Sequence, residues 1–311
     1  MNILILAEKK KKVQPILDVL KKRGHSTYLR LSKIVLVSKK TRTRVKAYGN
    51  ELDEYDAVFI HARTSLAPFV EPLLEEFEKI GCYTNIKRGS YYTGWNEPYL
   101  MVTLTQEQVA IPKSISTGSA KNVEAISNKI SYPAIVKTYL GKKVHHVLLV
   151  NSSRELKLFA KSLKTEIDGF LVREFIQGDV ISCAVIGEKI FAVKRKCTQI
   201  AKEICEGKMF KLSEKEEDLV LSAAKATGYD IARIDLVKGK IIKVEPIIPI
   251  EEFNIACGEQ IENHIANYLI DKALEHEANK IIPYDFLGIR KFISKTIFAP
   301  LLKEWAKLWR D

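Results

Sequence analysis

Residues 231–246 read IARIDLVKGKIIKVEP, two apolar segments separated by a Lys-Gly pair. Such β-branched runs around a short turn predict two antiparallel strands. The pairing would bring the carboxylates of Asp235 and Glu245 close together among apolar neighbours. Two close carboxylates repel unless a cation or a shared proton neutralises them. Mg²⁺ suits the pair, because it takes one or two carboxylates plus substrate phosphates. The alternative is two separate ion pairs, with Arg233 and Lys243.

Two segments upstream of these strands also carry polar groups at strand ends. VREFIQGD (172–179) predicts a strand that ends before Asp179, which could accept hydrogen bonds from ribose hydroxyls and is equally typical of a turn. KIFAVKRK (189–196) predicts a strand whose basic end includes Arg195, and a guanidinium suits a phosphate because its donors form a fork.

Lys137 closes the apolar run YPAIV within a predicted strand at 134–139. A lysine at such a position snorkels to solvent, forms an ion pair or meets a ligand phosphate. The position taken alone favours snorkelling.

The N-terminal part of the chain alternates predicted strands and helices. Strands are expected at 2–7, 26–29 and 57–62, helices at 13–22 and 69–80, and a hairpin over 33–48. This order indicates an open α/β lobe of Rossmann-like character, which we expect to span 1–95. It lacks GxGxxG after the first strand, so a standard dinucleotide site is not expected.

We expect three further regions after this lobe. A small α/β lobe at 96–168 would contain helices at 97–108, 121–129 and 153–163 and strands at 134–139 and 145–150. A larger lobe at 169–280 would follow, with a helix at 214–227 between its strands. The remaining tail, 281–311, is basic, amphipathic and helical, interrupted by Pro300. The tail could lie on a membrane surface or a partner, although docking on the chain itself or on a dimer mate is favoured.

Composition bounds the class of protein. The 311 residues carry 50 Lys+Arg against 38 Asp+Glu, a net charge of +12. This charge would attract polyanions, but the basic residues are dispersed, and a lysine-rich, thermophile-like surface of archaeal type explains them better. No zinc-finger, RRM or KH motif is present, so nucleic acid is not an expected partner. Five scattered cysteines indicate reduced thiols, and no run is long enough to span a bilayer, so we expect a cytoplasmic protein.

The order of these motifs is more specific than any one of them. YPAIVK, a strand, a helix, LVREFI, GD, another strand, VKR and a final Asp…Glu pair together resemble the ATP-grasp superfamily, and within it the RimK-like carboxylate–amine ligases. The resemblance covers roughly 90–250. It implies a mixed α/β fold, with a Rossmann-like lobe followed by two ATP-grasp lobes that hold ATP between them.

The resemblance also implies roles for individual residues. Lys137 corresponds to a lysine on the nucleotide phosphates, and Asp179 to the acidic residue on the ribose. Glu174 corresponds to the hinge residue beside the adenine, in a pocket completed by Val172, Phe175 and Ile176.

The remaining correspondences concern the reacting groups. Arg195 corresponds to an arginine on the phosphate and acyl-phosphate side, and so acts in catalysis together with Lys137. Asp235 and Glu245 correspond to magnesium ligands, with Mn²⁺ as a possible substitute. Arg63 resembles a first-domain arginine near the substrate.

Four features depart from the family pattern. A second phosphate-binding lysine is expected where Glu97 stands, and the glycine-rich loop has only Gly141. The metal motif ends in Ile247 instead of asparagine, a loss that Glu251 or Asn254 could offset. The substrate loop after VKR is shortened to CTQIAKEICEGK.

The favoured function is an active ligase that forms an amide or peptide bond through an acyl phosphate, releasing ADP and phosphate. Its substrates would be ATP, an amino acid and the carboxylate of a small molecule, peptide or carrier protein, and it could form homo-oligomers. The alternative is a non-catalytic nucleotide- or partner-binding protein with the same fold. The sequence does not identify the carboxylate or the amine.

Overall fold

The structure of the chain, a computed structural model, describes residues 1–24, 26–140, 143–163, 167–196 and 207–281. Contacts divide the chain into two compact units. Of the described residues, unit 1 contains those within Met1–Tyr92, Gly228–Ile231 and 246–281, and unit 2 those within Thr93–Thr227 and Ala232–Glu245. The domain boundaries expected from the sequence stay predictions.

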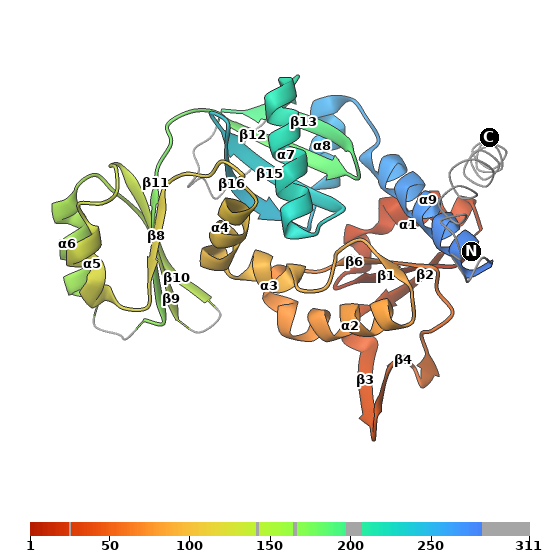
Figure 1. Cartoon of the computed structure of the whole chain (residues 1–311). Coiled ribbons are helices and arrows are strands. Elements are labelled where there is room, and N and C mark those ends of the chain that lie inside the picture. The colour runs from red at the N-terminus through yellow and green to blue at the C-terminus, as the bar shows by residue number, and fades with distance from the viewer. Residues whose placement is uncertain (25, 141–142, 164–166, 197–206, 282–311) are drawn as a thin grey trace, which may run out of the picture. The chain divides into compact units, whose positions relative to one another are not determined.

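Unit 1 is built on a parallel sheet of order β2-β1-β6-β7 (Figure 1). Its strands are β1 (Ile3–Ala7), β2 (Ser26–Arg30), β6 (Ala57–His61) and β7 (Tyr83–Thr84). Every residue of β1 is buried, as its uninterrupted apolar run predicts for a strand covered on both faces. The helices of this unit are α1 (Gln14–Lys22), α2 (Ala67–Lys79), α8 (Ile250–Cys257) and α9 (Ile261–Ile281).

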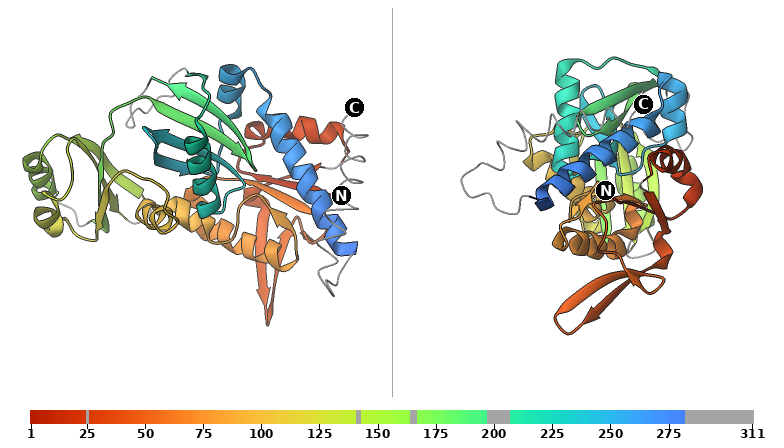
Figure 2. Two further views of the ribbon diagram at one scale, coloured as in Figure 1. Left: turned by 45° about the horizontal axis from the view of Figure 1, so that its top comes forward. Right: turned by 90° about the vertical axis from the view of Figure 1, so that its right-hand side faces the viewer.

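The predicted hairpin is confirmed as a separate three-stranded sheet of order β3-β4-β5. It consists of β3 (Ile34–Lys39), β4 (Arg42–Ala47) and β5 (Asn50–Glu51). Figures 1 and 2 show β3 and β4 protruding away from the parallel sheet of this unit.

The first sheet of unit 2 is antiparallel, with the order β10-β9-β11-β8. It contains β8 (Ser114–Thr117), β9 (Ala134–Leu140), β10 (Lys143–Val150) and β11 (Gly169–Glu174). Helices α5 (Val123–Ile126) and α6 (Ser153–Ser162) cover one face, over a core that includes Val136, Phe170 and Leu156 (Figure 1). Helix α3 (Ser90–Trp95), at the boundary of the units, and α4 (Glu97–Gln106) precede the sheet.

The second sheet of unit 2 has the order β14-β13-β12-β15-β16. Its strands are β12 (Val180–Ile186), β13 (Lys189–Arg195), β14 (Gly207–Met209), β15 (Ile231–Val237) and β16 (Lys240–Glu245). Helix α7 (Glu214–Thr227) contacts β12 and β16. The tight turn is confirmed, because Lys238 and Gly239 both have positive φ, 47° and 67°, as a type I′ hairpin requires.

Short 3-10 turns complete the described elements: Lys10–Lys12, Leu31–Lys33, Thr64–Leu66 and Ala120–Asn122. The mixed α/β class is confirmed. Within the described ranges, no helix has the length and apolar character needed to cross a membrane. The predicted tail falls almost entirely on 282–311, outside the described residues.

Candidate functional site

Lys137 neither snorkels nor stands alone, because it forms an ion pair with Glu97. Its Nζ lies 2.6 Å from Glu97 Oε2, and the two side chains are only 21% and 18% exposed. Glu97 opens α4, whereas Lys137 lies in the middle of β9. The charge reversal noticed in the sequence therefore neutralises the lysine that was expected to meet phosphate.

Two further side chains complete this cluster. Arg173 of β11, 4% exposed, donates from Nη1 to Glu97 Oε1 at 3.0 Å and to the carbonyl of Ile242 at 2.9 Å. The hydroxyl of Tyr139 donates to Glu97 Oε2 at 3.2 Å. Arg173 thus links the sheet that carries Lys137 to β16 of the second sheet. Arg173 has no predicted role from the sequence, although a charged residue inside the apolar segment FLVREFI (170–176) is a signal of a buried ion pair.

Electrostatics differ for the two partners of the central ion pair. Burial alone would raise the pKa of Glu97, but Lys137 and Arg173 outweigh it, so the pKa lies below its ordinary value. The pKa of Lys137 is lowered, first by burial and then by Arg173 and Lys243, against the opposing effect of Glu97. The carboxylate is stabilised by two cations, whereas the ammonium shares one carboxylate and is repelled by two neighbours. Lys243 therefore lies within electrostatic reach of Lys137.

The predicted metal ligands lie on one face of the second sheet. Asp235 pairs in register with Lys243, and Arg233 pairs with Glu245, so all four side chains share that face. Arg233 donates two hydrogen bonds to the buried Asp235, at 2.9 and 2.8 Å, and Lys243 lies 2.8 Å from Glu245. The separate ion pairs held open by the sequence are thus present.

This donor set fits a magnesium ion held mainly by phosphate oxygens. Two carboxylates on one face suffice for such an ion, provided that Arg233 and Lys243 move off the two carboxylates when the metal binds. The described ranges contain no cluster of three or more His, Cys, Asp or Glu residues suited to a metal. Asn254 is engaged elsewhere in unit 1, since it bonds Glu262 and the N–H of Ile261 at the start of α9.

One residue of the predicted adenine pocket lies in the core of the first sheet of unit 2. Val172 pairs with Val136 in the sheet and packs in the core beneath α5 and α6, so its side chain faces away from Lys137. The one-residue alternation of a strand places Leu171 on the Lys137 face instead. The sequence of VREFI does not specify this register, and a place for Val172 beside the adenine stays a prediction.

The other predicted hinge residues are half-buried. The carboxylate of Glu174 lies 3.5 Å from Lys240, and the N–H of Phe175 donates to the carbonyl of Pro133 at 3.0 Å. Ile176 packs against a small apolar cluster that includes Val237 of β15. These contacts also connect the end of β11 with the second sheet.

The face that carries Lys137 exposes apolar side chains beside it. In register, Val147 lies opposite Lys137 and Leu149 opposite Ile135. Val147 is 49% exposed and Leu149 is 38% exposed. An exposed apolar surface next to a lysine is suited to a ligand with both apolar and anionic parts.

The predicted ribose and phosphate residues come from β12 and β13. Asp179 lies just before β12 and forms an ion pair with Lys194 at 3.3 Å. Arg195 is 3% exposed and lies opposite Val180 in the register. By strand alternation, Arg195 and Lys194 point to opposite faces of the sheet.

Arg63 belongs to unit 1 and follows β6. Its side chain is 69% exposed, and its guanidinium contacts both carboxylate oxygens of Glu8, with Nη2 2.7 Å from Oε2. Both residues follow parallel strands at their carboxyl ends, a common position for substrate-binding groups in open α/β sheets. Burial alone would raise the pKa of Glu8, but the hydrogen bonds and the charge of Arg63 have the larger combined effect, so the pKa lies below its ordinary value.

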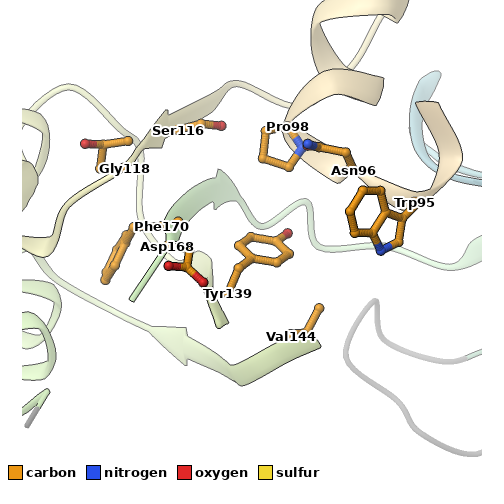
Figure 3. A pocket seen from close by; sticks show the side chains of 11 residues that line it. Trp95, Asn96, Pro98, Ser116, Gly118, Tyr139, Val144, Asp168 and Phe170 are labelled. Atoms are coloured by element: carbon orange, nitrogen blue, oxygen red, sulfur yellow. The ribbon is translucent and has the colours of Figure 1, made fainter. Parts of the chain in front are cut away.

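A cavity of about 400 Å³ borders the Glu97 cluster within unit 2 (Figure 3). Tyr139 belongs to both, because its ring lines the cavity while its hydroxyl donates to Glu97. Trp95, Ser116 and Asp168 bring aromatic, hydroxyl and carboxylate groups to the lining. Nothing in their sequence spacing pointed to this cavity.

Two departures from the family pattern cannot be placed. Gly141 and Lys142 of the glycine-poor loop, and residues 197–206 of the shortened substrate loop, lie outside the described residues.

Comparison with solved structures defines the class of fold. The chain is similar to the ATP-grasp ligase PsnB in complex with its minimal precursor, with a TM-score of 0.68 and 14% identity, covering 87% of this chain and 98% of that one. PsnB in complex with a phosphomimetic precursor variant, Mg and ADP gives a TM-score of 0.67 and 12% identity, covering 88% and 99%. The fold is therefore that of ATP-grasp ligases.

Sequence comparison defines the family. The RimK-like ATP-grasp domain matches residues 99–269, more than half of the chain, so the protein belongs to the RimK-like ATP-grasp family. A relative described as "Probable alpha-L-glutamate ligase" from Trichodesmium erythraeum is 22% identical over 269 residues, covering 82% of this chain and 90% of the relative.

Proposed function

We propose that this protein is an ATP-dependent carboxylate–amine ligase that forms an amide or peptide bond through an acyl phosphate. The γ-phosphoryl group of ATP passes to a carboxylate oxygen, which gives ADP and an acyl phosphate. The amine nitrogen then attacks the acyl carbon, and phosphate leaves with the electron pair of the broken C–O bond. The proton lost by the amine passes to solvent.

One observation carries this proposal. Arg173 bonds Glu97 on one side and the carbonyl of Ile242 on the other, which ties the Lys137 face to the strand next to Asp235. The effect of Lys243 on the pKa of Lys137 supports the same proximity. A triphosphate held there would meet cationic and acidic groups together, the combination that phosphoryl transfer needs for positioning and charge stabilisation.

The charges around this position favour a nucleotide bound with a metal. In the Glu97 cluster and on the Asp235–Glu245 face together, four cations accompany three carboxylates, a net charge of only one: Lys137, Arg173, Arg233 and Lys243 against Glu97, Asp235 and Glu245. This surplus is far smaller than the charge of a triphosphate. A magnesium ion on Asp235 and Glu245 would supply the missing positive charge and neutralise the phosphate oxygens. Mn²⁺ could take the same oxygen donors.

We propose the remaining roles as follows. Arg195, buried at the end of β13, would stabilise the transferring phosphoryl group together with Lys137. Asp179 would accept from the ribose, and Glu174 with Phe175 and Ile176 would border the adenine.

The substrate side is proposed from other observations. Arg63 in unit 1 would bind a substrate carboxylate. The relatives that are named alpha-L-glutamate ligases support glutamate as the first amine to test. PsnB in complex with a precursor peptide supports a peptide carboxylate among the candidate acceptors, beside small molecules and carrier proteins.

A second candidate function is favoured by the ion pairs. Lys137, Asp235 and Glu245 are each neutralised within the protein, by Glu97, Arg233 and Lys243. A protein of this fold that binds a nucleotide or a partner without catalysis would retain such pairs.

The two functions are separated by measuring ADP release with ATP, Mg²⁺, glutamate and a panel of peptide and small-molecule carboxylates. The ligase predicts ADP release that requires both an amine and a carboxylate, with the amide detected by mass spectrometry. Lys137→Met should abolish it, whereas Lys129→Met, an exposed lysine of the same lobe, should not. Nucleotide binding without substrate-dependent ADP release across the panel would favour the non-catalytic function.

A further inference from the structure

The hairpin of β3 and β4 concentrates positive charge. Between residues 33 and 48 the sequence has six basic residues and no acidic one: Lys33, Lys39, Lys40, Arg42, Arg44 and Lys46. Neither the sequence motifs nor the proposed ligase site uses this segment.

The register places most of this charge on one face. Val35 lies opposite Lys46, Val37 opposite Arg44, and Lys39 opposite Arg42. Because paired residues share a face and alternate residues along a strand do so too, these six side chains form one surface, called here the hairpin outer face. Its two valines are 54% and 40% exposed.

The opposite face of the hairpin packs into unit 1. Ile34, Val45 and Ala47 are buried, and β4 contacts α2. The hairpin is therefore held by an apolar base, and its outer face is not needed to fix it in place.

The charge of the outer face is neutralised only near its base. Glu51 of β5 forms ion pairs with Arg44 and, at 3.6 Å, with Lys46. Lys39 and Arg42, at the tip, form no ion pair with any described part of the chain. A small hollow of about 50 Å³ is lined by Arg42 and Arg44 together with the carboxylates of Glu51, Asp53 and Glu76. Lys39 and Lys40, at the turn, are exposed and keep the tip cationic.

β3 is also an edge strand. It is terminal in the order β3-β4-β5, and no strand of the described chain pairs with its outer side. The backbone N–H and C=O groups along that side can accept a further strand.

We propose that the β3 edge binds an extended, acidic protein segment, which adds to this sheet as a fourth strand. Backbone hydrogen bonds along β3 would give affinity, while apolar side chains on Val35 and Val37 and carboxylates on the tip cations would give selectivity. A protein segment fits better than nucleic acid, because the outer face has valines and a free backbone edge and has no aromatic side chain on which bases could stack. This inference does not depend on ligase activity.

The test uses fluorescein-labelled peptides and fluorescence anisotropy with the full chain. The first peptide, Val-Thr-Val-Thr-Glu-Glu, is called the glutamate–valine peptide; it is six residues long, the length of β3, and carries both valines and one glutamate on the same face. The second, the glutamate–proline peptide, has proline in place of both threonines, which keeps the charge but removes amides needed for strand pairing. The third probe is a labelled oligothymidylate. Hydrogen exchange of the β3 amides with and without the first peptide locates the contact.

Variants separate the hairpin from general surface charge. Lys39→Glu combined with Arg42→Glu reverses two exposed charges at the tip, and Lys21→Glu combined with Lys22→Glu makes the same change on α1. The first double variant should raise the Kd for the glutamate–valine peptide by about tenfold or more, and the second double variant should change this Kd far less. Thermal unfolding of both variants verifies that each is folded.

The proposal predicts binding of the glutamate–valine peptide, weaker binding of the glutamate–proline peptide and added protection of the β3 amides. No peptide binding would overturn it and would assign the cations to protecting the edge from aggregation. Equal binding of the two peptides would also overturn strand addition. Tighter binding of oligothymidylate would overturn the choice of a protein partner.

Discussion

Replacing Glu97 by glutamine tests whether its carboxylate restrains Lys137. The substitution removes the charge that lies 2.6 Å from the lysine but retains a side-chain oxygen that can accept from Lys137 and Arg173. Two opposite effects follow. The protein without nucleotide should lose stability, because two cations lose a charged partner, and ATP should bind more tightly, because the repulsion between Glu97 and phosphate disappears.

The size of the second effect follows from geometry. A phosphate oxygen about 2.8 Å from Lys137, on the side away from Glu97, would lie about 5.4 Å from the carboxylate. At an effective dielectric constant of about 20, one unit charge at that separation contributes about 3 kcal/mol of repulsion. Since both side chains are partly exposed, about half of this is expected, close to a tenfold change in Kd. The cost to stability without nucleotide should be about 2 kcal/mol.

The assay is calorimetric titration of a non-hydrolysable ATP analogue with Mg²⁺, combined with urea unfolding of the same samples. Glu124→Gln is the matched control, because Glu124 is 76% exposed and its contact with Lys157 is long, at 3.9 Å, so the loss of this charge should change little. Unchanged or weaker nucleotide binding in Glu97→Gln, with the fold intact, would refute the idea that Glu97 competes with phosphate for Lys137.

Three further outcomes are expected. The pKa of Glu97 is lowered in the folded state, so the ionised carboxylate stabilises the fold fully above its ordinary pKa of 4.5, and this stabilisation is lost as pH falls through the folded pKa. In thermal melts from pH 7 to 3, acid should therefore destabilise the wild type more than Glu97→Gln. Arg173→Leu should lower the free energy of unfolding in urea by about 3 kcal/mol, because it leaves the buried Glu97 carboxylate and the Ile242 carbonyl without this donor. A loss below about 1 kcal/mol would contradict the structural role given to Arg173. Glu71→Gln should cost about 1–3 kcal/mol, since buried Glu71 accepts from three backbone N–H groups around the start of α3, whereas Glu75→Gln on the same helix should cost less than about 1 kcal/mol.

Most strands and turns could be predicted from the sequence, because the residues that specify them are neighbours in the chain. The run ILILA predicted β1, and the Lys-Gly pair predicted the turn between β15 and β16. Helix α9 was missed because its apolar residues spread around the whole helix instead of forming one stripe, so no helical periodicity marks it.

The site was only partly accessible, because its decisive contacts join residues far apart in the chain. Glu97 was recognised as a charge reversal, but its pairing with Lys137, 40 positions later, needs the folded structure. Arg173 received no role, since its partners lie on α4 and β16. The burial of Val172 in the core beneath α5 and α6 could not be foreseen, because the register of β11 against β9 cannot be read from one strand alone.

The most direct measurement for the account is calorimetric titration of a non-hydrolysable ATP analogue, with and without Mg²⁺, on the wild type, Asp235→Asn and Asp218→Asn. Asp218 is an exposed residue of α7 and serves as the control. We expect Mg²⁺ to strengthen binding in the wild type and in Asp218→Asn, and to have little effect in Asp235→Asn. Equal affinity with and without Mg²⁺ in the wild type, or full metal dependence in Asp235→Asn, would contradict the site described for this protein.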